Sequence, residues 1–230
     1  MDSGAKLLDV GCGDGSFLLA ARNIGWDVVG VDIQPEAARK AGLDAYENIE
    51  QVSGKAPFDC ITMWHSLEHM TDPKLTLRQL SKLLKPNGVL FIAVPCSNSF
   101  QARVFKHHWI PLDVPRHLYG FDLKSLSLCL EKAGLAVRRK WHTEVEYDLM
   151  GWSQSALNMC FSDPNVFLDQ LAGKRRDVGW LTCMAHVALG CILTALALPL
   201  VLVEAWCRRG GTLVVKTEPT GQGTVMKREE

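Results

Sequence analysis

The chain has 230 residues, which is enough for one domain with a sizeable hydrophobic core and too few for two full domains. Lysine plus arginine and aspartate plus glutamate balance at 25 each, and no arm rich in lysine and arginine is present, so nucleic acid is not an expected partner. The eight cysteines form no C-x-x-C pair and no signal peptide opens the chain, which predicts a cytoplasmic protein with reduced thiols.

Short apolar runs alternate with segments of helical spacing from residue 6 to residue 145. Strands are expected at Lys6–Val10, Asp27–Val31, Leu43–Tyr46, Phe58–Trp64, Val89–Val94, Ala136–Glu144 and Thr212–Thr217. Helices are expected at Ser16–Asn23, Glu36–Ala41, Leu75–Leu84 and Leu123–Ala133, with a turn at Lys85–Gly88. Strands that alternate with helices predict a doubly wound α/β fold, with a mostly parallel sheet and helices on both faces.

Three glycines lie between the first strand and the first helix, in the segment Asp9–Gly15. Glycine accepts positive φ angles and lets a ligand approach the backbone closely. Asp32 ends the second strand about 20 residues after the loop, where a carboxylate can accept hydrogen bonds from both hydroxyls of a ribose. Ligands of open α/β sheets bind beyond the carboxyl ends of the strands, so the loop and Asp32 together predict a site for a nucleoside.

Two cofactors compete for this loop. A dinucleotide site would read G-x-G-x-x-G, with its third glycine inside the helix, whereas this loop reads G-x-G-x-G. Asp9, two residues before the first glycine, disfavours a pyrophosphate and suits a ligand that carries an ammonium and a sulfonium. The pattern therefore favours S-adenosylmethionine (SAM) over NAD(P), and a loop that only turns the chain is the structural alternative.

Several motifs, in the right order, resemble those of class I SAM-dependent methyltransferases. The matching segments are Asp9–Gly15, Val29–Ile33, Phe58–His69, Leu83–Leu90 and Pro115–Phe121. The last three are similar to the branch that includes the ubiquinone-biosynthesis O-methyltransferases. The resemblance covers about residues 6–145 and a final strand near 212–217, and it implies a Rossmann-like sheet whose last strand is antiparallel.

The resemblance also implies which residues bind SAM. Gly11 and Gly13 would let the backbone meet the methionine part, Asp9 would order the loop, and Asp32 would hold the ribose hydroxyls. The adenine would pack on the residue after Asp32, and the amino-acid end would lie beside the residues that close the fourth strand. The implied set is Asp9, Gly11, Cys12, Gly13, Asp32, Ile33, Met63 and Trp64.

Two imidazoles and a carboxylate follow the fourth strand at helical spacing. On a helix, His65, Glu68 and His69 would share one face. A metalloprotease of the H-x-x-E-H kind disagrees with the surrounding strands. Some quinone-pathway relatives carry E-x-x-E-H, which implies a divalent metal at Glu68 and His69, but His65 replaces the first glutamate here. We favour a structural role for the trio, with the metal and an acid/base role for His65 as alternatives.

Transfer of a methyl group to oxygen needs positioning of the acceptor and a base that takes its proton. His117 is the candidate base, because imidazole titrates near neutrality, and a role in bracing its loop is the alternative. The expected function is SAM-dependent methylation, at oxygen, of a small-molecule or lipid-linked acceptor. A SAM-binding scaffold without catalysis and an NAD(P)-dependent oxidoreductase are the other hypotheses.

One long apolar run stands apart from this pattern. No charged residue lies between Leu181 and Val203, and roughly 20 such residues suffice to cross a bilayer as a helix. Trp180 and Trp206 flank the run, and two basic clusters, Lys174–Arg176 and Arg208–Arg209, lie outside it.

A single crossing would strand the last predicted strand on the far side of the membrane, and two crossings need about twice the apolar length. Gly190 and Pro199 also interrupt the run. We therefore expect a kinked helix or a helical hairpin that touches one leaflet on the cytoplasmic face, or otherwise a buried helix or dimer surface. Residues 1–147 and 211–218 would then form the methyltransferase domain, with residues 148–210 as a hydrophobic insertion.

Overall fold

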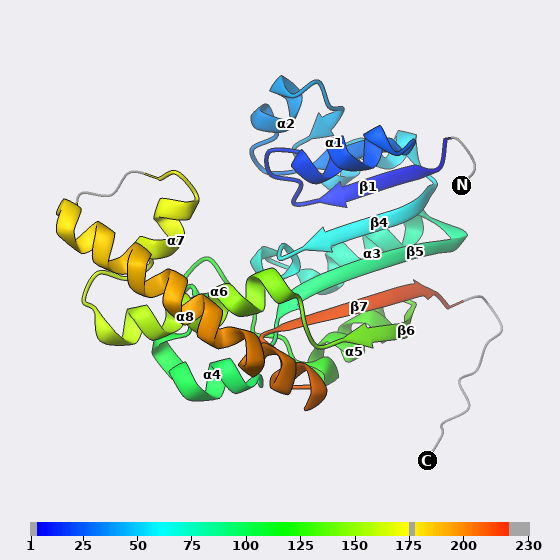
Figure 1. The fold of residues 1–230 in the computed structure, drawn as a ribbon. Helices are drawn as coiled ribbons and strands as arrows, with labels where there is room; N and C mark the ends of the chain where they lie inside the picture. The colour runs from blue at the N-terminus through cyan, green and yellow to red at the C-terminus, as the bar shows by residue number, and fades with distance from the viewer. Residues whose placement is uncertain (1–3, 175–177, 221–230) are drawn as a thin grey trace, which may run out of the picture. The chain divides into compact units, whose positions relative to one another are not determined.

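The computed structural model describes residues 4–174 and 178–220 (Figure 1). The chain forms two compact units. The first contains Met1–Val94, Lys124–Lys140 and Val215–Glu230, and the second contains Pro95–Leu123 and Trp141–Val214. The predicted insertion, residues 148–210, falls within the second unit, which also takes in residues 95–123. Arg175 and Arg176 of the first predicted basic cluster lie outside the described residues.

A seven-stranded sheet organises the fold in the order β3-β2-β1-β4-β5-β7-β6. The strands are β1 (Lys6–Val10), β2 (Asp27–Val31), β3 (Ala45–Tyr46), β4 (Phe58–Trp64), β5 (Leu84–Pro95), β6 (Leu135–Trp141) and β7 (Thr212–Pro219). The first five strands pair in parallel, and β7 runs in the opposite direction to β1 and β4 (Figure 1). The predicted fold, a mostly parallel sheet with an antiparallel last strand and an apolar helix before it, is confirmed.

The helices of the first unit are α1 (Ser16–Asn23), α2 (Glu36–Lys40), α3 (Pro73–Leu83) and α5 (Leu123–Lys132), with 3-10 turns η1 (Ile49–Lys55) and η2 (Leu67–His69). Helix α3 shows why these segments are helical. Asp72 accepts a hydrogen bond from the backbone N–H of Leu75 at 2.9 Å, and Pro73 occupies the first turn, where its missing N–H costs nothing. Leu77 and Leu80 are then fully buried on one face of α3.

The turn predicted between α3 and the fifth strand lies inside β5. Phe58 of β4 pairs with Leu84, but Cys60 pairs with Val89, so four residues of β5 lie opposite one residue of β4. A Cβ atom on Gly88 would lie 2.9 Å from the carbonyl oxygen of Phe58. Residues 85–88 therefore form a bulge within a strand that begins earlier than predicted.

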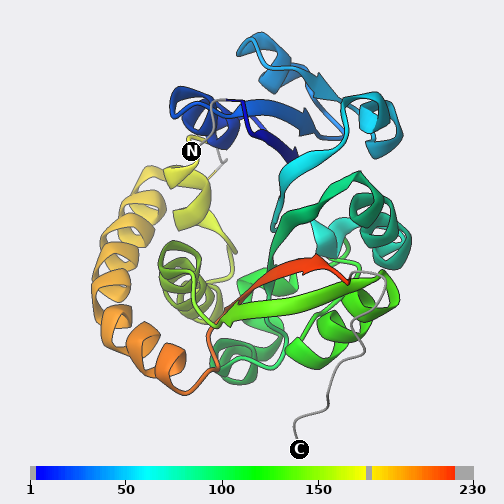
Figure 2. The same ribbon diagram turned by 90° about the vertical axis from the view of Figure 1, so that its right-hand side faces the viewer.

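The second unit consists of helices that the sequence pattern mostly does not reveal. They are α4 (Phe100–Phe105), α6 (Val145–Cys160), α7 (Val166–Leu171) and α8 (Trp180–Trp206), with two 3-10 turns, η3 (Lys106–His108) and η4 (Ile110–Leu112). Helix α8 packs against α6 and α7. It is one continuous helix with Pro199 inside it, and Figure 2 shows that α8 bends along its length. Of the two predicted forms, the single bent helix is therefore the one observed, and the hairpin is wrong.

A polar core joins three helices of the second unit. The side-chain amide of Gln101, on α4, donates to Oε1 of Glu204 on α8 at 2.9 Å and to the carbonyl oxygen of Asp148 on α6 at 3.1 Å. Nε1 of Trp152 donates to the other oxygen of Glu204 at 3.0 Å. A side chain on Gly151 would collide with the Gln101 amide, which shows how tightly this core is packed.

Both acids of this core are buried, and among the described residues neither forms an ion pair with a lysine or arginine. Burial raises the pKa of Asp148 to about 6 and the pKa of Glu204 to about 7, and the negative charge of Asp148 contributes to the second shift. The folded protein therefore holds protons on these groups that the unfolded chain releases.

We expect the free energy of unfolding to fall as pH rises from about 4.5 to 7, because the native pKa values lie above the ordinary ones. Each unit of pKa shift corresponds to about 1.4 kcal/mol. Glu204→Gln should flatten part of this slope, measured as the melting temperature at several pH values. Glu146→Gln, an exposed acid on α6, is the control. Equal slopes in the wild type and Glu204→Gln would contradict the assignment.

Candidate functional site

The glycine loop begins where β1 ends and leads into α1. The backbone N–H groups of Gly11 and Cys12 both donate to the carbonyl oxygen of Val31, at 2.7 and 3.1 Å, which ties the loop to the end of β2. Gly11 has φ +85°, and a Cβ atom there would lie 2.5 Å from Cβ of Ser66. Only glycine fits this position without moving the segment after β4.

Asp32 holds the loop from the opposite side. One carboxylate oxygen accepts the N–H of Gly13 at 2.9 Å, and the other accepts the N–H of Gln34 at 2.9 Å. A carboxylate offers about four acceptor positions, so two are left for hydroxyl groups of a ligand. A Cβ atom on Gly13 would meet nothing within 4 Å, and Ile33 is 86% exposed. The open space at Gly13, the hydroxyl acceptor Asp32 and the apolar side chain of Ile33 thus lie at the ends of β1 and β2, where the hydrogen bond from Gly13 to Asp32 joins the two segments.

Asp9 is buried at the end of β1, where Oγ1 of Thr62 donates to its Oδ1 at 2.6 Å. Burial raises the pKa of Asp9 to about 6; the Thr62 hydrogen bond opposes the shift, and the charge of Asp32 adds to it. No ion pair joins Asp9 to a lysine or arginine within the part of the chain that the structure describes. A cationic ligand would supply that missing positive charge.

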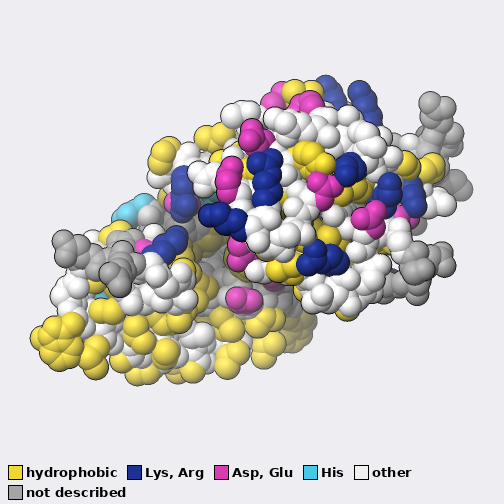
Figure 3. Space-filling model, turned by 90° about the horizontal axis from the view of Figure 1, so that it is seen from above, with side chains coloured by type: hydrophobic (Ala, Val, Ile, Leu, Met, Phe, Trp, Pro, Cys, Tyr) yellow, Lys and Arg dark blue, Asp and Glu magenta, His cyan; other side chains and the backbone are white. Residues whose placement is uncertain are grey.

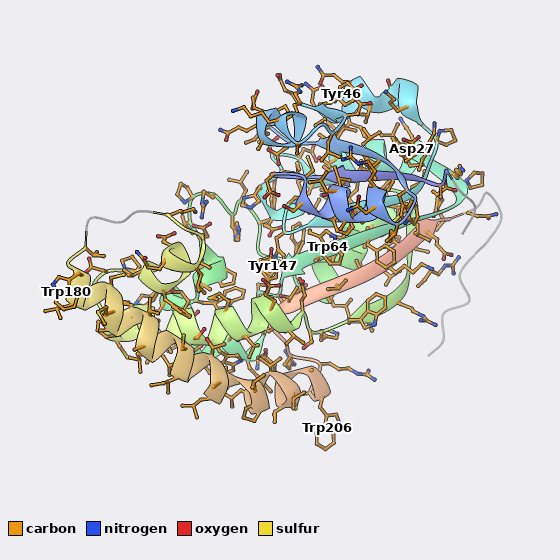
Figure 4. The ribbon with its side chains drawn as sticks, turned by 45° about the horizontal axis from the view of Figure 1, so that its top comes forward. Asp27, Tyr46, Trp64, Tyr147, Trp180 and Trp206 are labelled. Carbon is orange, nitrogen blue, oxygen red and sulfur yellow. The ribbon has the colours of Figure 1, made fainter. Side chains whose placement is uncertain are left out.

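Two residues of the predicted SAM-binding set have buried side chains. Cys12 packs below Gly30, where a Cβ atom would lie 2.7 Å from its sulfur, and burial raises the pKa of its thiol to about 12. Met63 is fully buried in β4. Only backbone atoms of these two residues are available to a ligand, whereas Trp64, the last residue of β4, is partly exposed (Figure 4).

The trio after β4 does not share one helical face as expected. His65 has φ +47° and donates its N–H to the carbonyl oxygen of Ala93 at 2.9 Å, and the 3-10 turn begins only at Leu67. Nδ1 of His65 still lies 3.7 Å from a carboxylate oxygen of the buried Glu68, while His69 is exposed. This contact suits a structural role for Glu68, and the metal alternative at Glu68 and His69 stays a prediction.

His117 belongs to the second unit. Its Nδ1 lies 2.6 Å from the carbonyl oxygen of Pro111, and a carbonyl only accepts hydrogen bonds, so Nδ1 carries the proton of the neutral ring. Nε2 is then the nitrogen with basic character. Arg116 pairs with Asp113 in the same loop, and the N–H of His117 donates to the Asp113 carbonyl oxygen at 3.0 Å. These contacts brace the loop, and both roles predicted for His117, the base and the brace, stay predictions.

Sequence reasoning missed Thr62 and Ser66. The Ser66 hydroxyl donates to the carbonyl oxygen of Val10 at 2.7 Å, and this hydrogen bond joins the segment after β4 to the end of β1. Both contacts join residues more than 50 positions apart and depend on the register between β1 and β4. The one available signal was a hydroxyl residue, Thr62, among the otherwise apolar residues 60–64 of β4.

Comparisons with known proteins show which proteins this chain resembles in sequence. A family model described as a methyltransferase domain matches residues 1–140. A ubiquinone biosynthesis O-methyltransferase of Xanthomonas campestris is 35% identical over 102 residues, which are 39% of this chain and 43% of that protein. One from Xanthomonas oryzae is 34% identical over 103 residues, 40% of this chain and 43% of its own length. The matched segment thus spans less than half of these relatives.

Solved structures share the fold at low identity. A putative sarcosine dimethylglycine methyltransferase from Galdieria sulphuraria superimposes with a TM-score of 0.58 at 14% identity, over 93% of this chain and 78% of that one. The [4+2]-cyclase SpnF gives 0.55 at 20% identity, over 96% of this chain and 78% of its own. At these identities the likeness establishes the fold alone.

Proposed function

Because the chain belongs to the class I SAM-dependent methyltransferase superfamily, we propose that it transfers a methyl group from SAM to an oxygen of a small-molecule or lipid-linked acceptor. The observation that carries this is the joint arrangement of Gly13, Asp32 and Ile33 at the carboxyl ends of β1 and β2. SAM is the cofactor of this superfamily, and the arrangement fits each of its parts.

Different residues would bind the ribose, the adenine and the methionine part of SAM. Asp32 would accept the ribose hydroxyls with the lone pairs that Gly13 and Gln34 leave unused. Ile33, almost fully exposed, would pack on the face of the adenine. The open backbone at Gly13 would face the methionine part, whose positive charge Asp9 would stabilise.

Methyl transfer from SAM to an oxygen requires that the acceptor be aligned with the methyl group and that one proton be removed from the acceptor. When bound, SAM supplies a methyl group on a sulfonium, which is a good leaving group. The residues of the chain hold the acceptor in line with that group. Nε2 of His117 would take the proton of the acceptor hydroxyl, while the Pro111 carbonyl oxygen holds Nδ1–H and stabilises the charged ring.

The acceptor class rests on two further observations. The Xanthomonas relatives are named as O-methyltransferases of ubiquinone biosynthesis, which favours a lipid-linked acceptor. The second is α8, whose exposed surface is apolar. Both favour an acceptor that resides in a bilayer over one dissolved in water.

Purified protein should melt at a higher temperature with SAM or S-adenosylhomocysteine and at an unchanged temperature with NAD(P), because a ligand that binds only the native state stabilises it. With labelled SAM, a lysate fraction that contains lipids should acquire label. A shift with NAD alone would support an oxidoreductase instead. Binding of SAM without label in any acceptor would support a non-catalytic scaffold.

His117→Ala should lower kcat at least about tenfold while the SAM-induced rise in melting temperature persists, because the base acts on the acceptor and not on the cofactor. His107→Ala removes an exposed imidazole from the same unit and is the control. Wild-type turnover in His117→Ala would rule out the base and leave the bracing role.

Helix α8 has its polar residues on the inside. The stripe that faces the rest of the unit consists of His186, Gly190, Ala197, Val201 and Glu204, all buried. Leucine, isoleucine and tryptophan side chains cover the exposed part, and Figure 3 shows hydrophobic side chains gathered along the edge of the view that α8 occupies. A surface helix of a soluble protein has the opposite arrangement.

A lipid bilayer fits this surface better than a protein partner does. In the most apolar 18-residue stretch of α8, only 22% is buried, so apolar side chains cover most of the circumference of the helix. A rigid protein partner would contact only one side of such a helix. Trp180 and Trp206 mark the two ends of α8 (Figure 4), and Lys174 and Arg208 lie just beyond them in the sequence. These basic residues would meet anionic lipid head groups.

The helix would lie in the plane of one leaflet. By length and composition α8, at 27 residues, could cross a membrane, and it is the one such helix among residues 4–174 and 178–220. The chain nevertheless returns to the sheet directly after it, since the N–H of Cys96 donates to the carbonyl oxygen of Gly211 at 2.8 Å and β7 follows. The protein would thus be peripheral on the cytoplasmic face, with the acceptor drawn from the same leaflet.

The wild-type chain should float with liposomes that contain anionic lipid, and the double variant Ile192→Glu/Leu196→Glu should remain in the dense fraction. Both side chains are exposed, at 56% and 63%, so the variant should fold normally. Ile24→Glu/Leu128→Glu, with exposed side chains in the first unit, is the matched control and should float. A wild-type protein that stays down as a dimer would show that α8 is an interface between two copies.

A further inference from the structure

Asp9 and Thr62 form a buried pair across neighbouring strands. They face each other in the register of β1 and β4, and they are 4% and 3% exposed. The Thr62 hydroxyl lies 2.6 Å from Oδ1 of Asp9 and 3.4 Å from the carbonyl oxygen of Leu8, so the carboxylate is its main acceptor. This is the one side-chain hydrogen bond to Asp9 that the described residues provide.

The charged and titratable groups around Asp9 do not favour its ionised form. On β2, Gly30 lies opposite Asp9 without a side chain, and Asp32 adds a like charge. The thiols of Cys12 and Cys60, each with a pKa raised to about 12, are neutral. The Thr62 hydroxyl is thus the group that stabilises a carboxylate at this position, because a hydrogen bond donated to an ionised acceptor is stronger than one to a neutral acceptor.

We propose that Thr62 is a positioning residue for the cofactor, which acts through Asp9 by holding its carboxylate ionised and in one orientation. The inference rests on the proposed SAM site, since the negative charge of Asp9 would act on the positive charges of SAM bound beside it. A neutral Asp9 would offer no attraction to the ammonium and the sulfonium of SAM, and a rotated one would aim its charge elsewhere.

The dissociation constant for SAM, measured by calorimetry between pH 5 and pH 7, tests this. In the wild type, affinity should rise with pH as Asp9 ionises. In Thr62→Val the rise should move upward by about one pH unit, which weakens binding about tenfold on the rising part of the curve. Thr62→Ser, which keeps the hydroxyl, should restore the wild-type profile.

Two controls separate this role from a structural one. Thr217→Val removes another fully buried strand hydroxyl, one that donates to the carbonyl oxygen of Leu90, and should keep the wild-type profile. Asp9→Asn should bind SAM weakly with no rise across this range, and it serves as the test if Thr62→Val does not fold. A Thr62→Val profile that is lowered equally at every pH, or unchanged, would overturn the proposal, as would a persisting rise in Asp9→Asn. A wild type that does not bind SAM at all would instead refute the proposed function.

Discussion

The carboxylate of Asp32 accepts one backbone N–H on each of its oxygens, and the geometry of the site follows from that constraint. The bond from Gly13 fixes the glycine loop above the end of β2, and the bond from Gln34 fixes the start of the following turn. With both neighbours held, Ile33 has no core to enter and projects into solvent. An exposed isoleucine beside a restrained acid and an open backbone is unfavourable for stability alone, and it is what a nucleoside site requires.

The first half of the chain was predictable because its signals are local. Strands β1, β2 and β4 have the bounds expected from the sequence, since each is a short apolar run that must be buried on both faces of a parallel sheet. Asp9 and Asp32 lie at the carboxyl ends of β1 and β2, so the sequence could place both acids at one edge of the sheet. The bulge at residues 85–88 was read as a turn because the same residue types serve both, and only pairing with β4 distinguishes them.

The second unit was not predictable in this way, because its helices bury polar side chains. Helix α6 encloses Asp148, Ser153, Gln154 and Ser155, so its apolar residues do not trace the inward face. Helix α8 is apolar over most of its circumference, and its two buried polar residues, His186 and Glu204, were too few to show which side is inside. The contact of Thr62 with Asp9 was hidden for a different reason, since it depends on the pairing of strands that are far apart in sequence.

The glycines around Gln101 show that residues 148–210 are not a detachable module. The side chain of Gln101 packs between Gly151 and Gly211, and a Cβ atom on Gly211 would lie 2.7 Å from its amide nitrogen. That nitrogen donates hydrogen bonds to α6 and to α8. Excision of residues 148–210 would remove most of α6 and all of α7 and α8, and would leave the buried Gln101 amide on α4 without acceptors. Deletion of residues 148–210 would therefore destabilise α4 and the residues around it, and would not release an independent domain.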